Sequence, residues 1–280
     1  MEARIDLHVH SNCSDGTYTP EELVLYALRK GLSAFALTDH DTVDGVRRAQ
    51  QAASGTSLTV IPGVELSSDY KGRDIHVLGL GVRMEDPGFS AYLEQFRRAR
   101  DVRNQKMLQK LRDRGISISE EQMLSEFPGC VWTRAHFARF LKDHGYVQDM
   151  QEAFKKYVGD HAPCFVPKEQ ISPFEAVRLL LDNGAHPVLA HPLLYHLGPS
   201  ELENLVDQLC VCGLQGLEAV YSTNRFSDES AMKQLALRHG LCVTGGSDFH
   251  GSNKPDIDLG TGHGNLNIPC SLWEKLRGCS

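Results

Sequence analysis

Two histidines separated by one residue stand near the start of this sequence, at the end of an apolar run. In "RIDLHVHSNCSDG" they are His8 and His10, and Asp15 follows five residues after His10. Alternate residues of a β-strand point to the same face, so both imidazoles can reach one ion. Imidazole with carboxylate is a donor set for divalent metals, which activate water for hydrolysis.

Six further histidines and carboxylates follow or interrupt other short apolar runs. They are His40, Glu65, His76, His191, Asp248 and His250. One such histidine alone is more often a hydrogen-bonded polar residue than a ligand. Nine of these side chains at one end of a fold are better explained by metal, because divalent ions reverse the repulsion between buried carboxylates.

This donor set also predicts the ions and the substrate class. Nine ligands exceed what one ion needs, so we expect two or three divalent ions, with Glu65 as a bridging ligand. All donors are imidazole or carboxylate, which favours Mn²⁺ first, with Zn²⁺ or Fe²⁺ as alternatives. Such a cluster carries positive charge and therefore favours an anion, with phosphate esters as the leading class.

Seven apolar and β-branched runs are predicted strands that position these residues. They span residues 4–9, 33–39, 57–66, 74–82, 186–191, 216–221 and 242–248. Helical patterns alternate with them, and "TPEELVLYALRKG" carries Thr19 as N-cap, Pro20 at its first position and Gly31 as its stop. The alternation predicts an α/β fold of parallel βα units, in which the C-terminal ends of the strands form the active-site face.

The alternation stops between residues 88 and 165, where only helical patterns occur. We therefore expect an inserted helical cap domain at 88–165, flanked by two barrel parts at 1–87 and 166–280, with strand–helix units resuming at "CFVPKEQ". The basic residues of the long helix "AYLEQFRRARDVRNQKMLQKLRDRG" spread around its circumference, which is typical of a solvated surface. They are Arg97, Arg98, Arg100, Arg103, Lys106 and Lys110.

Composition bounds the remaining possibilities. The 280 residues carry a formal net charge of −7, which argues against a DNA-binding surface. The eight cysteines lack a CxxC pair and are expected to be reduced thiols. No apolar run is long enough for a membrane span, and the charged N-terminal residues do not resemble a signal peptide. We expect a cytoplasmic protein without a membrane partner.

Five motifs together resemble the PHP (polymerase and histidinol phosphatase) family of metal-dependent phosphoesterases. They are "DLHVHSNCSDG", "ALTDHDTVDG", "PGVELS", "LAHP" and "TGGSDFHG". The resemblance implies a distorted (βα)7 barrel with an inserted small helical domain and a trinuclear metal centre. It implies one ion held by His8, His10, Glu65 and Asp248, a second by Asp15, His40 and His250, and a third by Glu65, His76 and His191. Asp39 and Asp41 are expected to orient ligands or loops.

The insertion with "WTRAHFARFL" resembles one branch of that family, which includes nucleoside 3',5'-bisphosphate phosphatases and a 5'-to-3' exoribonuclease of short RNAs. The branch implies substrate contacts for Arg134 and His136, although Ala135 replaces the usual proline between them. A solvated helix start with Thr133 as N-cap is the alternative. The implied reaction removes the 3'-phosphate of a nucleoside 3',5'-bisphosphate, and a 5'-phosphorylated short RNA is a further substrate. The expected attacking group is a hydroxide that bridges two metals, and His136 is one candidate general acid.

Three other functions fit parts of the same pattern. A histidinol-phosphate or other small phosphomonoester phosphatase would use the same metals without a second phosphate site. A non-catalytic module would use them only to stabilise a binding surface. A hydrolase of C–N bonds would share the strand-end histidines, but the order of the ligands favours a phosphoesterase.

Overall fold

The computed structural model describes residues 2–166 and 171–279. Within these residues one sheet contains seven strands in chain order: β1 (Ile5–Val9), β2 (Ala34–Leu37), β3 (Thr59–Tyr70), β4 (Arg73–Leu80), β5 (His186–Leu189), β6 (Gly216–Tyr221) and β7 (Cys242–Gly246). The first and last strands approach each other, because the backbone N–H of Asp248 donates to the carbonyl of His8 at 2.8 Å. The result is a nearly closed, distorted barrel, which confirms the predicted fold class.

The prediction of parallel strands throughout is wrong for the third and fourth strands. β3 continues to Tyr70 and turns through Gly72, after which β4 returns antiparallel to β3 and also pairs antiparallel with β5. The predicted strand 57–66 ended too early because polar Ser67 interrupts the apolar run. In the hairpin this residue is buried and lies opposite His76.

This reversal explains how His76 reaches the other predicted ligands. His76 lies in the first half of β4, and Glu65 lies in the middle of β3 rather than at its end. An antiparallel strand begins at the edge where its neighbour ends. The start of β4 therefore lies at the same end of the barrel as the C-terminal ends of the parallel strands.

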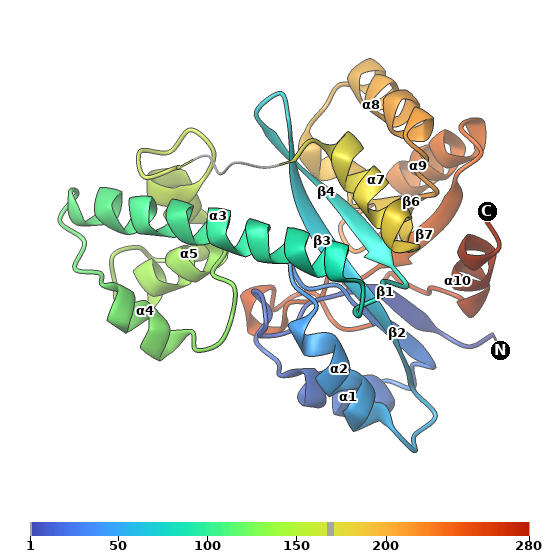
Figure 1. Ribbon diagram of the computed structural model, residues 1–280, viewed down its shortest axis with the longest axis horizontal. Coiled ribbons are helices and arrows are strands. Elements are labelled where there is room, and N and C mark those ends of the chain that lie inside the picture. The colour runs from blue at the N-terminus through green and yellow to red at the C-terminus, as the bar shows by residue number, and fades with distance from the viewer. Residues whose placement is uncertain (1, 167–170, 280) are drawn as a thin grey trace.

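Helices cover the outside of the sheet (Figure 1). They are α1 (Pro20–Arg29), α2 (Asp44–Ala53), α7 (Pro173–Asn183), α8 (Pro199–Val211), α9 (Phe226–Arg238) and α10 (Cys270–Arg277), with 3₁₀ turns η2 (Pro192–Tyr195) and η3 (Gly251–Asn253). The N-cap prediction for Thr19 is confirmed, since its side chain accepts the N–H of Glu22. Leu23 and Val46 pack α1 and α2 against β2. A second cluster packs α7 against β3 and β4 and includes residues of α8, α9, β5 and β6.

The segment between β4 and α7 contains helices and loops but no strand in its described part, and it lies to one side of the barrel (Figure 1). It contains α3 (Pro87–Arg112), α4 (Glu120–Glu126), α5 (Arg134–Asp143), α6 (Met150–Ala153) and the π-helical turn η1 (Phe154–Val158). These helices share a hydrophobic cluster around Met107, Trp132 and Phe137, whereas Phe89 at the start of α3 packs on the barrel. We keep 88–165 as the proposed insertion. The predicted restart at "CFVPKEQ" lies partly outside the described residues.

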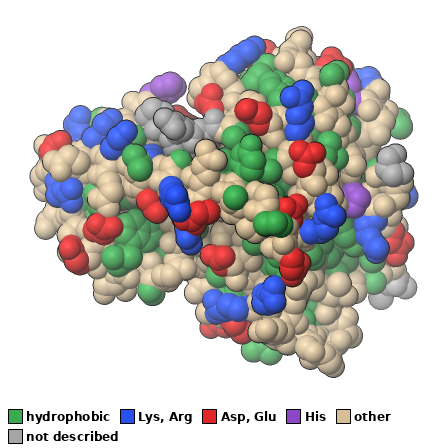
Figure 2. Space-filling view, viewed as in Figure 1, with side chains coloured by type: hydrophobic (Ala, Val, Ile, Leu, Met, Phe, Trp, Pro, Cys, Tyr) green, Lys and Arg blue, Asp and Glu red, His purple; other side chains and the backbone are tan. Residues whose placement is uncertain are grey.

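The surface and the cysteines add two findings. Acidic and basic side chains are interspersed over the face shown in Figure 2, and no helix in the described ranges is long and apolar enough to cross a membrane. Cys242 and Cys279 form a disulfide, which corrects the prediction that every cysteine is a reduced thiol. Packing of α10 against β7 brings these two positions together, and sequence spacing did not indicate it.

Candidate active site

All nine predicted ligand side chains converge at one end of the barrel. Seven of them are buried, and His40 and His76 are partly buried. Within the described residues they form four overlapping groups whose donor atoms lie within 4.8 Å of one another. The groups are His10, Asp15, His40 and His250; His8, Glu65 and His191; His8, His10 and Asp248; and His40, Glu65 and His76. This overlap fits a cluster of more than one ion.

Glu65 occupies the centre of this cluster. Its Oε2 lies 3.2 Å from Nε2 of His8 and 3.1 Å from Nε2 of His10. Its Oε1 lies 2.9 Å from Nδ1 of His76 and 2.9 Å from Nε2 of His191. A carboxylate with imidazoles on both oxygens has the placement expected of a bridging ligand.

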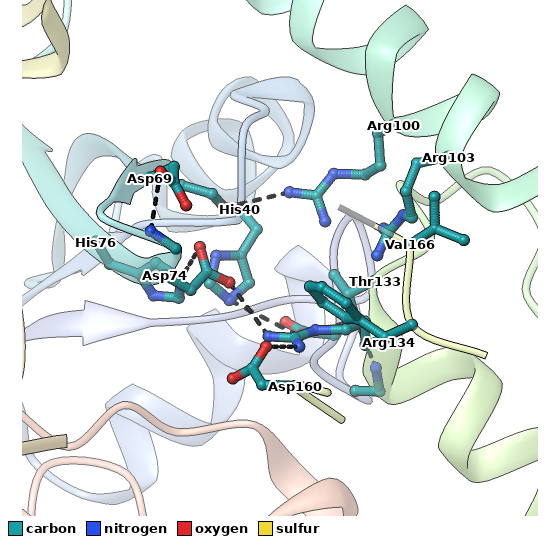
Figure 3. Close-up of a pocket in the computed structure, with 15 residues that line it drawn as sticks. His40, Asp69, Asp74, His76, Arg100, Arg103, Thr133, Arg134, Asp160 and Val166 are labelled. Carbon is teal, nitrogen blue, oxygen red and sulfur yellow. Dashed lines mark hydrogen bonds and ion pairs between the residues drawn. The ribbon is translucent and has the colours of Figure 1, made fainter. Parts of the chain in front are cut away.

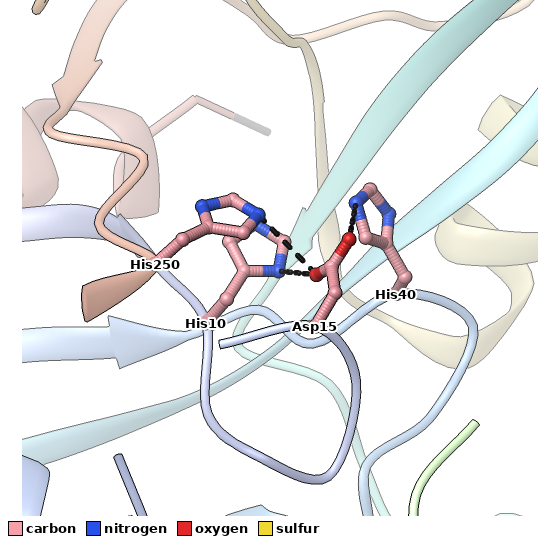
Figure 4. A group of neighbouring side chains, drawn as sticks. All are labelled: His10, Asp15, His40 and His250. Carbon is pink, nitrogen blue, oxygen red and sulfur yellow. Dashed lines mark ion pairs between the residues drawn. The ribbon is translucent and has the colours of Figure 1, made fainter. Parts of the chain in front are cut away.

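Asp15 organises a second part of the cluster, between His40 on one side and His10 and His250 on the other (Figure 4). Its Oδ1 lies 3.2 Å from Nε2 of His250 and 3.7 Å from Nδ1 of His10, and its Oδ2 lies 3.8 Å from Nε2 of His40. Among the described residues, Asp15 Oδ1 and His40 Nδ1 are buried and make no hydrogen bond of acceptable geometry, although His250 and Glu65 lie 3.2 Å from them. Buried polar atoms without a partner are costly, and metal ligation would satisfy them. The residues therefore fit a divalent ion.

The charges of the ligands balance one another. Burial would raise the pKa of Glu65 and Asp15, but the surrounding imidazoles outweigh it and hold both values well below the usual range. Burial would lower the pKa of His76, but Glu65 and Asp74 raise it to about 10. Burial lowers the pKa of His40 to about 3. Imidazoles such as His76 must therefore lose a proton before they bind an ion.

A second layer of polar groups orients the ligands, and one of its members was not predicted. Glu218 on β6 is buried, with Oε1 3.0 Å from Nδ1 of His8, and its Oε2 accepts the backbone N–H of His191 at 2.8 Å. A carboxylate on Nδ1 directs Nε2 of the same imidazole toward the metal. The sequence feature that could have indicated this role is a single carboxylate inside the apolar strand "GLEAVY".

Two further interactions fix the loops that carry ligands. Asp39 accepts the backbone N–H of Ser11 at 2.8 Å and the hydroxyl of Ser14 at 2.6 Å, which holds the loop leading to Asp15. This agrees with the hydrogen-bonding role expected for Asp39.

Close packing of β7 on β1 depends on Gly246. A Cβ at this position would lie 2.2 Å from Cβ of His8. Glycine at this position therefore allows β7 to approach β1 and close the barrel.

A cavity of about 250 Å³ extends from the histidine cluster toward α3 (Figure 3). Arg100, Arg103 and Arg134 line it, with His40 and His76 at its other side. The prediction of a solvated basic helix is wrong for Arg100 and Arg103, which are only 4% and 5% exposed. Spacings of three and four residues align them with the buried Met107. On this face Arg100 reaches Asp41 of the barrel, whereas Met107 packs within the insertion.

The two buried arginines differ in how well they are neutralised. Arg100 pairs with Asp41 and donates to the hydroxyl of Ser67 at 3.3 Å. Arg103 donates to the carbonyl of Trp132 at 3.3 Å. Burial lowers the pKa of Arg103 to about 9, and repulsion from the neighbouring arginines adds to this effect. Arg103 therefore brings to the cavity a positive charge that a bound anion would neutralise.

The two residues of the predicted substrate pair lie in different surroundings. Arg134 lines the cavity and is held by Asp160 at 2.6 Å and Asp74 at 3.3 Å. His136 is buried, and its Nδ1 accepts the backbone N–H of Thr133 at 2.9 Å as part of the N-cap of α5. Burial lowers the pKa of His136 to about 4, so the ring is neutral. The alternative that Thr133 caps this helix is confirmed, and its hydroxyl also donates to Asp15 at 3.1 Å.

Comparison with known proteins identifies the family of this chain. Residues 6–160 match the PHP domain model. The chain belongs to the PHP family. It is 33% identical to the 3',5'-nucleoside bisphosphate phosphatase of Chromobacterium violaceum, over 98% of this chain and 96% of that relative. It is also 33% identical to the 5'-3' exoribonuclease Rnm of Escherichia coli, over 96% of this chain and 94% of the relative.

A solved structure shares the whole fold of this PHP protein. An amidohydrolase from Chromobacterium violaceum with bound sulfate and no metal has a TM-score of 0.88 and 33% identity, covering 99% of this chain and 96% of its own. The relatives and the buried ligand cluster make this chain a metal-dependent phosphoester hydrolase. The alternative of a non-catalytic module is therefore not supported.

Proposed function

We propose that this PHP phosphoesterase removes the 3'-phosphate of nucleoside 3',5'-bisphosphates, and that 5'-phosphorylated short RNA is a second substrate. One observation carries the proposal: a single cavity has the ligand cluster at one end and three arginines at the other. Divalent ions bound there would neutralise phosphoryl oxygens and activate water. A substrate with two phosphates matches both ends, whereas a monophosphate would leave the arginine end without a phosphate.

The arginines are suited to hold the phosphate that is not cleaved. Among the described residues, the buried Nε atoms of Arg100 and Arg103 have no hydrogen-bond partner. Arg134 is held in place by two carboxylates and lies over the ring of Phe165 at 5.5 Å. Guanidinium groups bind phosphate through paired N–H donors, and burial strengthens that attraction.

The division of the ligands among three ions remains our proposal. The close approach of His8, His10 and Asp248 supports a first ion with Glu65. The group around Asp15 supports a second, and Glu65 with His76 and His191 supports a third. Mn²⁺ is the first choice, with Zn²⁺ or Fe²⁺ as alternatives, and elemental analysis of the purified protein would distinguish them. His136 is not proposed as a general acid, because its side chain is buried and is not among the residues that line the cavity.

Phosphate release by the Mn²⁺-supplemented protein tests this function. The substrates are adenosine 3',5'-bisphosphate, adenosine 3'-phosphate, adenosine 5'-phosphate and histidinol phosphate. We expect kcat/KM for the bisphosphate to exceed that for the 3'-monophosphate by about 10- to 100-fold, the effect of one or two charge-assisted hydrogen bonds. Faster release from histidinol phosphate would favour the small-monoester alternative.

Substitution of Arg134 examines the arginine end of the cavity. Arg134→Met should lower kcat/KM for the bisphosphate far more than for the 3'-monophosphate. Arg98→Met is the matched control, because the Arg98 side chain is 77% exposed and pairs only with Glu94 among the described residues. Equal losses on both substrates would contradict the assignment of the second phosphate to this end.

A further inference from the structure

Another cavity lies outside the active site, between the barrel and the proposed insertion. Its volume is about 410 Å³, and α3, α4, the loop 127–132 and the first residue of α2 enclose it (Figure 1). It shares no lining residue with the ligand cluster or with the arginine-lined cavity. Ligand sites are frequent at domain interfaces and span roughly 300–1,000 Å³, so this cavity has the place and the size of one. We call it the α3–α4 cavity and define it by Asp44, Asp101, Asn104, Glu120, Phe127 and Trp132.

One buried amide that lines this cavity lacks a hydrogen-bond donor. Asn104 is 2% exposed, and its Nδ2 donates to the backbone carbonyl of Trp132 at 3.2 Å. A carbonyl can only accept, so this bond fixes which atom of the amide is nitrogen and which is oxygen. Within the described residues, the buried Oδ1 of Asn104 has no hydrogen-bond partner. A buried acceptor without a donor is costly, and an N–H group of a ligand in the cavity would remove that cost.

Carboxylates from three helices give the α3–α4 cavity negative charge. Asp44 comes from α2, Asp101 from α3 and Glu120 from α4. In the described ranges none of the three forms an ion pair, and Arg97, which also lines the cavity, pairs with Glu94. Burial raises the pKa of Asp101; Arg97 opposes this shift, and repulsion from Glu94 and Glu120 adds to it. The cavity therefore favours a cation.

The arrangement of these groups favours an organic cation over a metal ion. In the part of the chain that the structure describes, every group of three or more His, Cys, Asp or Glu donors within 4.8 Å of one another belongs to the histidine cluster. A Ca²⁺ ion takes roughly six to eight oxygen ligands at about 2.3–2.6 Å, which separated carboxylates do not provide. Apolar side chains form much of the remaining wall: Leu124, Phe127, Val131 and Trp132. Ammonium groups joined by methylene chains match both features, because each ammonium carries three N–H donors and aromatic faces attract cations.

We propose that the α3–α4 cavity binds an aliphatic polyamine, with one ammonium group donating to Oδ1 of Asn104 and the others pairing with the surrounding carboxylates. The methylene chain packs against Phe127 and Trp132. Helix α3 then separates two sites of opposite charge, because Arg100 and Arg103 line the cavity for anions and Asp101 lines the cavity for the polyamine. The inference does not depend on the proposed function, since the two cavities share no lining residue.

Tryptophan fluorescence reports binding at this cavity. The chain has two tryptophans, and Trp273→Phe on α10 leaves Trp132 as the only one. This protein, loaded with Mn²⁺ so that the ligand cluster is occupied, is titrated with spermidine at low ionic strength, where charges are weakly screened. We expect a saturable change in Trp132 emission. Calorimetry on the Mn²⁺-loaded wild-type protein should give one spermidine per chain.

Carboxylate substitutions in the same protein test the contacts. Asp101→Asn should weaken spermidine binding by about three- to tenfold, the effect of one partly exposed ion pair in a cavity. Asp101→Lys places an ammonium group of the protein in the cavity and should abolish saturable binding. Glu120→Gln should weaken binding in the same direction as Asp101→Asn. Glu121→Gln is the matched control, because Glu121 is an exposed carboxylate on α4 that does not line the cavity, and its affinity should stay within about twofold of the parent protein.

Three results would overturn the proposal. The first is the absence of saturable spermidine binding. The second is an equal loss of affinity in Glu120→Gln and Glu121→Gln, which would show general attraction to a negative surface. The third is a saturable response of Trp132 to Ca²⁺ that Asp101→Asn removes, which would assign the cavity to a metal ion. A crystal structure of the spermidine complex completes the test: an amine nitrogen within about 3 Å of Oδ1 of Asn104 is expected, and spermidine bound elsewhere refutes the site.

Discussion

Replacement of Arg103 by methionine should raise the stability of this protein and weaken its preference for a substrate with two phosphates. Arg103 is 5% exposed, and burial together with repulsion from Arg100 and Arg134 lowers its pKa from 12.5 to about 9. At 1.36 kcal/mol per pH unit, this corresponds to about 5 kcal/mol of unfavourable free energy for the charged form in the folded state. The protein retains this charge at neutral pH, which is consistent with a role in binding an anion.

The expected gain in stability is smaller than that value. Methionine keeps the packing of the aliphatic stem but loses the hydrogen bond to the carbonyl of Trp132, which Asn104 also donates to at 3.2 Å. We therefore expect Arg103→Met to raise the free energy of unfolding by about 1–4 kcal/mol, as for other buried charges replaced by apolar residues. Because the lowered pKa still lies above neutrality, the gain should be constant between pH 6 and 8 and should shrink as pH rises from about 9 toward 12.5.

The assays are denaturant unfolding at fixed Mn²⁺ and phosphate release from two substrates. For adenosine 3',5'-bisphosphate, kcat/KM should fall by about 10- to 100-fold, the effect of losing one charge-assisted contact to phosphate. Adenosine 3'-phosphate should be hydrolysed at nearly the wild-type rate. Arg98→Met on the exposed face of α3 should change neither property. A destabilised Arg103→Met protein, or equal losses on both substrates, would refute the reasoning.

Three further predictions concern the ligand cluster and the insertion. Glu218→Gln should weaken metal affinity by about 10- to 100-fold, because it weakens the hydrogen bond that orients His8, and metal titration that shows unchanged affinity would contradict this. The pKa of His76 is raised from 6.5 to about 10, so this residue should release a proton when metal binds at pH 7. Metal affinity should therefore rise with pH up to about 10. Calorimetry in buffers of different ionisation enthalpy would detect the released protons. His136→Ala should cost about 1–2 kcal/mol of stability through the lost cap of α5 while turnover persists, and a collapse of kcat in a folded variant would restore His136 as a catalytic candidate.

Local patterns were sufficient to predict most of the cluster and several helix starts. The spacing of His8 and His10 places both on one strand face, and the short apolar runs before His191 and Asp248 place those residues at strand ends. The N-caps at Thr19 and Thr133 involve residues only a few positions apart. These features depend on the regular geometry of a strand or helix, which sequence spacing reveals directly.

Other features depend on segments that are distant in the chain. The carboxylate of Glu218 reaches His8 across 210 positions, and its role was not predicted from sequence. Arg100 and Arg103 were expected in solvent because the whole circumference of their helix is charged. The packing of α3 against the barrel at Asp41 and against the insertion at Trp132 decides which of those arginines are buried.

The amino-acid sequence by itself determined the chemistry of this protein: its set of imidazoles and carboxylates, its helix and strand periods and its family. Tertiary structure decided the reversal of β4, which brings His76 to Glu65, and the burial of Arg103 opposite the cluster. The physical reason is that spacing along a chain specifies the direction of a side chain relative to its own helix or strand. The group that this side chain meets is specified by the packing of elements far apart in the sequence.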